Sequence, residues 1–351
     1  MTSIKKPTSI ALRLVGLLLV VLAVGGCYYT QAARGQLEVL SKREPIEEVL
    51  ADPTTEPDVA ERLQLVQDAR QFSIDELGLP DNGSYRSYAD LEREFVVWSV
   101  FATREFSLEP KRWCYPIVGC VSYRGYFRKA AAERESAKLK AKGFDVFAGG
   151  VAAYSTLGRF DDPVLNTMMR WGETQLVGVL FHELAHQVLY IRDDTGFNES
   201  FATAVEEYGV QKYLLDRGRS EAFEDYTEQK AFRRELMVLI DSARADLAAF
   251  YAETIDADEK RLLKEHRIER LVADLRALLE NSGRDADGWL RAPFNNARLV
   301  SFSLYEGYLP AFRQMLADCI GNLACFYSEA RRVSELDPSV RDAHLAALAT
   351  R

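Results

Sequence analysis

The amino-acid sequence predicts one predominantly helical α+β domain with a small mixed β-sheet, and three observations lead to that class. Apolar residues recur at helical spacing before residue 80 and again after residue 173. Apolar runs of the kind that form strands are confined to the part between, from residue 95 to residue 158. The chain of 351 residues is 48% hydrophobic, which is enough to bury one large core, and no repeat or flexible linker divides it.

The first 26 residues have the pattern of an export signal. Three basic residues precede a short apolar run over 14–24, and two glycines follow it. A membrane-spanning anchor is the alternative, but it needs about 20 apolar residues and this run is shorter. We therefore expect a signal peptide over 1–26 and a single domain over 27–351.

The single domain is expected to have three parts. Residues 28–90 have helical periodicity, most regular from 59 to 77, and Leu-Pro-Asp-Asn-Gly at 79–83 ends these N-terminal helices. Residues 91–216 form a mixed α/β part that holds the candidate site described below. Residues 217–351 form a helical part, which includes a long charged hairpin.

The elements of the second and third parts follow from their apolar patterns. Gly143 is expected to end one helix, Gly149 and Gly150 to break a strand region, and Asn198 to cap a second helix. The predicted strands lie at 95–102, 118–127 and, in short runs, 144–158. The predicted helices lie at 128–143, 175–191, 198–216, 219–255, 257–282 and, interrupted at Gly307, Pro310 and Gly321, 295–335.

The charge of the chain argues against nucleic acid as a partner. The whole chain carries −9, and the part after residue 26 has 41 basic and 53 acidic residues, a net charge of −12. Phosphate binding needs clustered Lys and Arg, and no such cluster occurs. We expect a monomer without a nucleic-acid partner.

Cysteine usage indicates an oxidising compartment. Apart from Cys27, the four cysteines form two pairs that each enclose five residues, an even count that fits disulfides. Four cysteines allow three pairings, and four free thiols are a further alternative. We expect the local pairings, Cys114 with Cys120 and Cys319 with Cys325.

The sequence His-Glu-Leu-Ala-His at 182–186 lies in a strongly apolar helical run. Positions i and i+4 of a helix lie about 40° apart, so His182 and His186 project from one face and can bind one Zn²⁺. Glu183 is rotated by about 100°, where it can act as the general base towards the attacking water. The alternative is a chance pattern on a buried helix, but only four histidines occur, and a metal supplies the polar partners that a buried His-Glu-His set needs.

A catalytic zinc site needs a third protein ligand, and an acid after the second histidine is the candidate. No further histidine occurs before His266, and two aspartates in the intervening turn come too soon. Glu199 begins the next predicted helix, which would return antiparallel to the first. Glu206 and Thr203 lie on the same face as Glu199 and are expected to support the ligand histidines. The alternative ligand is Glu206 or Glu207.

The residues Val-Gly-Gly-Cys at 24–27 resemble a bacterial lipobox. The resemblance implies cleavage before Cys27 and lipidation of that cysteine, so the chain would be anchored to a membrane at the bacterial cell envelope and face the periplasm. Two tyrosines follow Cys27 where an Asp would favour retention at the inner membrane, so the outer membrane is expected. Acyl chains, each worth about 0.8 kcal/mol per buried CH₂, give a stable anchor.

The motifs His-Glu-Leu-Ala-His and Asn-Glu-Ser-Phe-Ala (198–202) resemble those of the gluzincin metallopeptidases, which implies that Glu199 is the third zinc ligand. Further motifs resemble a bacterial family of predicted zinc aminopeptidases among cell-envelope lipoproteins. These are Trp-Cys-Tyr-Pro-Ile-Val-Gly-Cys at 113–120, Tyr-Arg-Gly-Tyr-Phe at 123–127 and Ala-Tyr-Ser-Thr-Leu-Gly at 153–158. The resemblance extends from Tyr28 to about residue 325. It implies a gluzincin-like core, one Zn²⁺ per chain and a peptide substrate.

One departure leaves the specificity open. The chain lacks the Gly-x-Met-Glu-Asn loop with which large gluzincin aminopeptidases hold the free amine of a substrate. An endopeptidase acting on envelope proteins is therefore an alternative to an aminopeptidase, and a non-catalytic scaffold that keeps the zinc fold is another. The intact Glu183 argues against the scaffold, because such a protein does not need that acid.

The resemblance also implies a substrate strand and an oxyanion donor. The segment 153–160 could pair with an extended substrate through Tyr154, Ser155 and Thr156, with an ordinary turn region as the alternative. Tyr305 is the predicted oxyanion donor and Tyr308 the next candidate, although either could be structural. Asn295 and Asn296 could line the cleft. His266 and His344 are expected at the surface.

Overall fold

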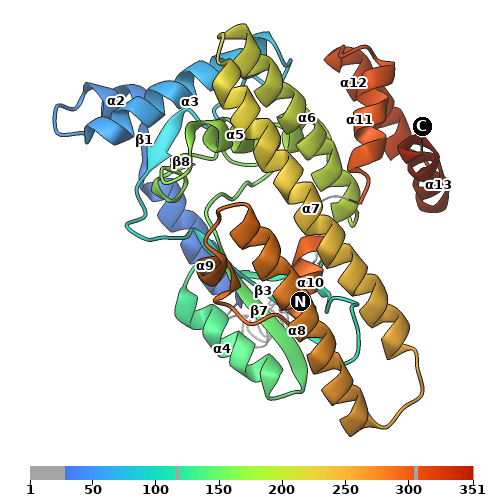
Figure 1. Cartoon of the computed structure of the whole chain (residues 1–351). Coiled ribbons are helices and arrows are strands. Elements are labelled where there is room, and N and C mark those ends of the chain that lie inside the picture. The colour runs from blue at the N-terminus through green and yellow to red at the C-terminus, as the bar shows by residue number, and fades with distance from the viewer. Residues whose placement is uncertain (1–27, 116–118, 304–306, 351) are drawn as a thin grey trace, which may run out of the picture.

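The computed structural model describes residues 28–115, 119–303 and 307–350 (Figure 1). The expected signal peptide over 1–26, Cys27 and Tyr305 lie outside the described residues. The described chain is predominantly helical with small sheets of two or three strands, as the sequence predicts. Among the described residues, no helix is both long enough and apolar enough to cross a membrane.

Three helices form the centre of the main core. Residues 28–41 are helical and precede the short helix α2 (Ile46–Ala51), and α3 (Pro57–Asp75) packs against α5 (Glu173–Val188) and α6 (Thr195–Asp216). The ring of Phe72 on α3 stacks on Phe181 of α5 and meets Tyr213 of α6 edge-on. These large apolar side chains are buried, so their packing fixes the three helices relative to one another around the site on α5.

The largest sheet places β3 (Val97–Arg104) between β6 (Arg124–Tyr126) and β7 (Phe144–Val151), and both pairings are antiparallel. The helices α4 (Lys129–Lys140) and α10 (Asn296–Ser303) pack on β3 and β7. The prediction of short strands broken at Gly149 and Gly150 is wrong, because β7 runs through both glycines. A Cβ on Gly150 would lie 2.3 Å from the ring of Phe95, so this glycine permits a close contact rather than breaking the strand.

Two smaller sheets complete the β-structure. β1 (Arg43–Pro45) pairs antiparallel with β2 (Ser87–Ala89), which pairs in parallel with β8 (Val164–Leu165). β4 (Trp113–Tyr115) and β5 (Gly119–Val121) form a two-stranded antiparallel sheet whose strands the Cys114–Cys120 disulfide joins, as predicted. The single strand expected at 118–127 is instead β5 and β6, which belong to different sheets. The three-residue β1 is too short to have a periodic signal, so the helical prediction for 28–90 misses it.

The C-terminal part is helical, as predicted (Figure 1). Its long hairpin joins α7 (Ser220–Tyr251) to α8 (Ala257–Asn281), and Asp256 caps the second of these helices. The Cys319–Cys325 disulfide joins the ends of two helices, and Pro310 lies in the first turn of a helix rather than interrupting one. The remaining helices are η1 (Asn166–Met168), α9 (Ala286–Leu290), α11 (Leu309–Asp318), α12 (Leu323–Ser334) and α13 (Pro338–Ala349).

The close contact between α5 and α6 requires a glycine, which has no side chain, at position 209. A Cβ on Gly209 of α6 would lie 2.7 Å from Cδ1 of Leu77 and 2.8 Å from the ring of Phe181, both fully buried. We expect Gly209→Ala to lower the free energy of unfolding by about 1–3 kcal/mol, because the helices must move apart. Thermal and urea unfolding would measure this change.

Gly178 of α5 provides the matched control for this substitution. A Cβ there would make ordinary contacts of 3.4 Å with Glu206 and Val210. Gly178→Ala should therefore be neutral or stabilise the helix by up to about 1 kcal/mol. Equal destabilisation by the two alanines would contradict the role assigned to Gly209.

Candidate metal centre

The helix α5 presents both predicted histidines on one face. Its apolar side is fully buried against neighbouring helices, which fixes the rotation of α5 about its axis. His182 and His186 lie one turn apart, and their ring centroids are 4.8 Å from each other. His186 is buried and His182 is partly buried, so both imidazoles lie at the inner side of the helix.

The helix α6 packs antiparallel against α5 and brings a carboxylate to both histidines. Oε2 of Glu199 lies 3.2 Å from Nε2 of His182, and Oε1 lies 3.8 Å from Nε2 of His186. One ligand atom from each of the three residues falls within 4.8 Å of the others. This set of two imidazole nitrogens and one carboxylate oxygen could hold a metal ion.

Glu206 contacts the opposite nitrogen of the same imidazole. Its Oε2 lies 3.1 Å from Nδ1 of His182, so one carboxylate faces each nitrogen of that ring. A carboxylate at Nδ1 holds the proton there and leaves Nε2 free as a ligand. This is the position predicted for Glu206 as a supporting residue. Thr203 lies one turn beyond Glu199 on α6, and its supporting role stays a prediction.

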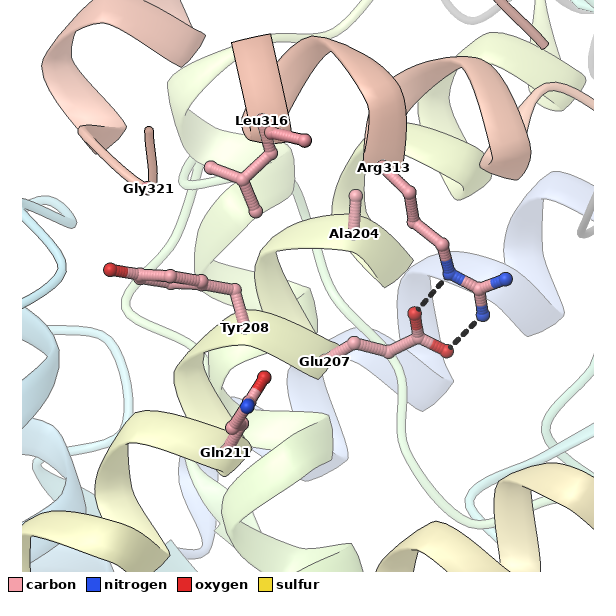
Figure 2. A pocket seen from close by; sticks show the side chains of 8 residues that line it. Ala204, Glu207, Tyr208, Gln211, Arg313, Leu316 and Gly321 are labelled. Carbon is pink, nitrogen blue, oxygen red and sulfur yellow. Dashed lines mark hydrogen bonds and ion pairs between the residues drawn. The ribbon is translucent and has the colours of Figure 1, made fainter. Parts of the chain in front are cut away.

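Glu207, the other alternative ligand, faces elsewhere. Both of its carboxylate oxygens accept hydrogen bonds from Arg313 of α11, at 2.7 and 2.8 Å. It lines a cavity of about 380 Å³ between α6 and α11 that includes none of the three clustered residues (Figure 2). The geometry therefore favours Glu199 over Glu206 and Glu207 as the third member of the cluster.

The start of α6 differs from the sequence prediction. Asp194 caps the helix by accepting a hydrogen bond from the backbone N–H of Phe197 at 3.0 Å, so Asn198 is not the cap. The buried Asn198 side chain instead bonds to the backbone N–H and C=O of Ile191, both at 2.7 Å. These bonds fix the turn between α5 and α6. The helix starts at Thr195, which places Glu199 in its second turn rather than its first.

The charges around His182 favour a cation at this position. Burial lowers the pKa of His182, but the hydrogen bonds to Glu199 and Glu206 outweigh burial and raise it to about 10. Burial raises the pKa of the Glu199 carboxyl, but its bond to His182 and the charges of both histidines outweigh burial and hold it below the usual range. Burial and the neighbouring His182 lower the pKa of His186 to about 4. A neutral His186 beside two ionised acids fits the donor set of a divalent metal.

Glu183 lies within electrostatic reach of His182, Glu199 and Asp162 and of the loop residue Ser155. Burial raises its pKa to about 7, with the charge of His182 opposing and those of Glu199 and Asp162 adding, and a hydrogen bond from Ser155 lowers it. A carboxyl with a pKa near neutrality is suited to accept and return a proton. The role of general base stays a prediction for Glu183.

The segment 153–160 is a loop with a turn and not a strand, which agrees with the ordinary turn region given as the alternative to a substrate-pairing strand. β7, one of the two edge strands of the largest sheet, ends just before this segment. Thr156 is bound to the buried Asp162 through its backbone N–H at 2.7 Å and its hydroxyl at 2.9 Å. Tyr154 bonds through its hydroxyl to Gln36. Of the three residues in this segment that are predicted to bind substrate, only Ser155 is placed beside Glu183.

The C-terminal candidates lie away from the cluster. Asn296 is fully buried, and its amide donates to the backbone carbonyls of Glu105 and Ser107 at 2.9 and 3.2 Å. Its carbonyl oxygen accepts a hydrogen bond from the hydroxyl of Tyr251, so the side chain is fully engaged inside the protein, and its substrate-binding role stays an untested prediction. The side chain of Asn295 donates to the backbone carbonyl of Val146.

Tyr308, the second candidate for the oxyanion donor, and the two histidines outside α5 are not among the clustered residues. The hydroxyl of Tyr308 donates to Asp342 at 2.8 Å, away from the clustered residues. His266 is exposed, as predicted, whereas His344 is half-buried.

Three tyrosines near the site were missed by sequence reasoning. Burial, and then the charge of Glu199, raises the pKa of Tyr123 and of Tyr190. Tyr85 is buried and has a φ of 61°, and burial and the charge of Glu183 raise its pKa. Tyr123 lies in one of the motifs quoted above, but nothing in its spacing relates it to Glu199. A tyrosine with positive φ gives no sequence signal.

The fold and the site together define a predominantly helical α+β protein with a histidine–histidine–carboxylate cluster that could hold a metal ion. The chain belongs to the family described as "Putative aminopeptidase", whose model matches residues 27–345. This family suggests a peptidase with a peptide substrate. No curated protein and no solved structure matches the chain.

Proposed function

We propose that the chain is a zinc-dependent peptidase and specifically an aminopeptidase. The observation that carries the proposal is the convergence of His182, His186 and Glu199 within 4.8 Å, with Glu183 on the adjacent face of α5. Two imidazoles and one carboxylate are the donors of gluzincin sites and suit Zn²⁺. The family to which the chain belongs supports the peptidase activity.

In this mechanism the protein residues have distinct tasks. Bound zinc would act as a Lewis acid that polarises the scissile carbonyl and acidifies water. Glu183 accepts the proton of the attacking water on its carboxylate and returns it to the leaving amine. Glu206 orients His182 through Nδ1. The backbone of β7 forms one edge of the largest sheet and could pair with an extended peptide.

The oxyanion donor is expected to be Tyr123, with Tyr305 as the alternative that the sequence predicts. Among the described residues, the partly buried Tyr123 lies within electrostatic reach of both Glu199 and Glu183. Tyr123→Phe should lower kcat by about 10²–10³-fold and leave KM unchanged, because the hydroxyl acts only on the developing charge. Steady-state kinetics would measure both constants.

Tyr308→Phe is the control for this prediction, since the hydroxyl of Tyr308 bonds to Asp342. It should retain full activity. A large loss of kcat in Tyr305→Phe with none in Tyr123→Phe would assign the donor role to Tyr305 instead.

The location of the enzyme is part of the proposal. The lipobox-like residues at 24–27 support a lipid anchor on Cys27 and a position at the bacterial cell envelope, facing the periplasm. The two disulfides fit an oxidising compartment. An outer-membrane location is preferred because no Asp follows Cys27 directly.

Metal analysis and matched peptide substrates test the function. The full-length chain, purified in detergent, should bind about one zinc ion and cleave peptides with a free amino terminus. The same peptides with acetylated amino termini should resist cleavage. Equal cleavage of both sets would establish the endopeptidase alternative. If the zinc-loaded chain cleaves neither set, the scaffold alternative replaces the peptidase.

A further inference from the structure

A charged side chain from a third helix reaches the support of the metal centre. Nζ of Lys230, on α7, donates to Oε1 of Glu206 at 3.2 Å, while Oε2 of the same carboxylate faces Nδ1 of His182 at 3.1 Å. The side chains of Lys230 and Glu206 are each 20% exposed. The two oxygens of Glu206 are thus divided between one lysine and one ligand histidine.

The position of Lys230 is itself fixed by its neighbours. Its ammonium lies 3.5 Å from Oε1 of Glu207 and 5.2 Å from the ring centroid of Tyr226. The side chain of Glu207 is held in one orientation, because Arg313 donates hydrogen bonds to both of its carboxylate oxygens (Figure 2). A row of alternating charges therefore runs from Arg313 through Glu207, Lys230 and Glu206 to His182.

Lys230 reduces the electrostatic repulsion between two neighbouring acids in this row. Glu206 and Glu207 are adjacent acids on α6, both mostly buried, and they repel each other unless a cation lies between them. Lys230 lies at hydrogen-bonding distance from one and ion-pairing distance from the other. Without the ammonium, the carboxylate of Glu206 would lose the contact that sets its rotation and would no longer hold both oxygens in place.

We propose that Lys230 is a positioning residue of the metal centre, which holds Glu206 against Nδ1 of His182 and thereby directs Nε2 towards the metal. The inference rests on the proposed metal site but not on the identity of the substrate. It makes α7 a part of the support for the centre, although every predicted ligand lies on α5 or α6. Lys230 acts through Glu206 and contacts no reacting atom.

The test is a double-mutant cycle with zinc affinity as its readout. Zinc dissociation constants would be measured for the full-length chain by competition with a chelator. Lys230→Met should weaken zinc binding by about tenfold, the lower end of the 10–100-fold that loss of a partner of a ligand histidine costs. Glu206→Gln should weaken it at least as much. In the Glu206→Gln background, Lys230→Met should not weaken zinc binding further, because the carboxylate through which Lys230 acts is already absent.

Two further variants separate positioning from general stability. Lys230→Arg should restore most of the zinc affinity, since a guanidinium can donate to the same oxygen. Lys264→Met removes another mostly buried lysine, which pairs with Asp145 at 2.7 Å, and should leave zinc affinity unchanged. Circular dichroism of each variant verifies that it is folded.

The outcomes distinguish this inference from the proposed function. Tight zinc binding by the wild type together with unchanged affinity in Lys230→Met would overturn the positioning role. Additive losses in the double variant would also overturn it, because Lys230 would then act independently of Glu206. Zinc binding without peptide cleavage would remove the peptidase and leave the positioning role intact.

Discussion

Glu183→Gln is expected to lower kcat for peptide cleavage by about 10²–10⁴-fold while the chain keeps its zinc. The amide has the size of the carboxylate but cannot accept the proton of the attacking water. The zinc should remain because Glu183 is not among the three clustered residues. Steady-state kinetics and metal analysis of the same preparation would measure both effects.

The control for this prediction is another acid of α5. Glu173 lies in the first turn and pairs with Arg219 at 2.7 Å, far along the helix from the histidines. Glu173→Gln should keep both zinc and activity. If Glu183→Gln retains more than about a tenth of the activity, Glu183 is not the general base.

Glu199→Gln should weaken zinc binding by more than about 100-fold, because even residues that only support a ligand contribute 10–100-fold. The substitution removes the charge that faces Nε2 of both histidines. Peptide cleavage should disappear with the metal and return only in part at high zinc concentrations. Dissociation constants from chelator competition would measure the loss.

Glu207→Gln provides the comparison on the same helix. Glu207 bonds to Arg313 instead of the cluster, so its amide variant should bind zinc far more tightly than Glu199→Gln. The reverse order of affinities would show that the third ligand is misassigned. The pair thus decides between Glu199 and Glu207, one of the two alternative ligands that the sequence leaves open.

The core of the site could be predicted because it depends on helical spacing. Residues four apart share a face of a helix, so the sequence alone places His182 and His186 together. The seven-residue step from Glu199 to Glu206 likewise puts both acids on the side of α6 that faces α5, and both contact His182. Periodicity within one element determines these neighbours.

The parts of the site that come from distant segments could not be predicted. Lys230 and Tyr123 reach the site through tertiary packing, which leaves no pattern in the nearby sequence. The same applies to Asn296, which looks like a polar residue for a cleft but satisfies buried backbone carbonyls. Gly150 was misjudged because a glycine in a strand can indicate either a break or a close contact.

The arrangement of the metal cluster has a consequence for how the chain folds. Glu199 is 17 positions from His182 and Glu206 is 24, so the cluster closes through one short connection between neighbouring helices. Such local closure has a small entropic cost, and local contacts form early in folding. The α5–α6 pair can therefore bring these candidate ligands together before α7 packs against it, and metal binding at that stage would favour the native pairing of the two helices. Lys230 would join a centre that is already assembled.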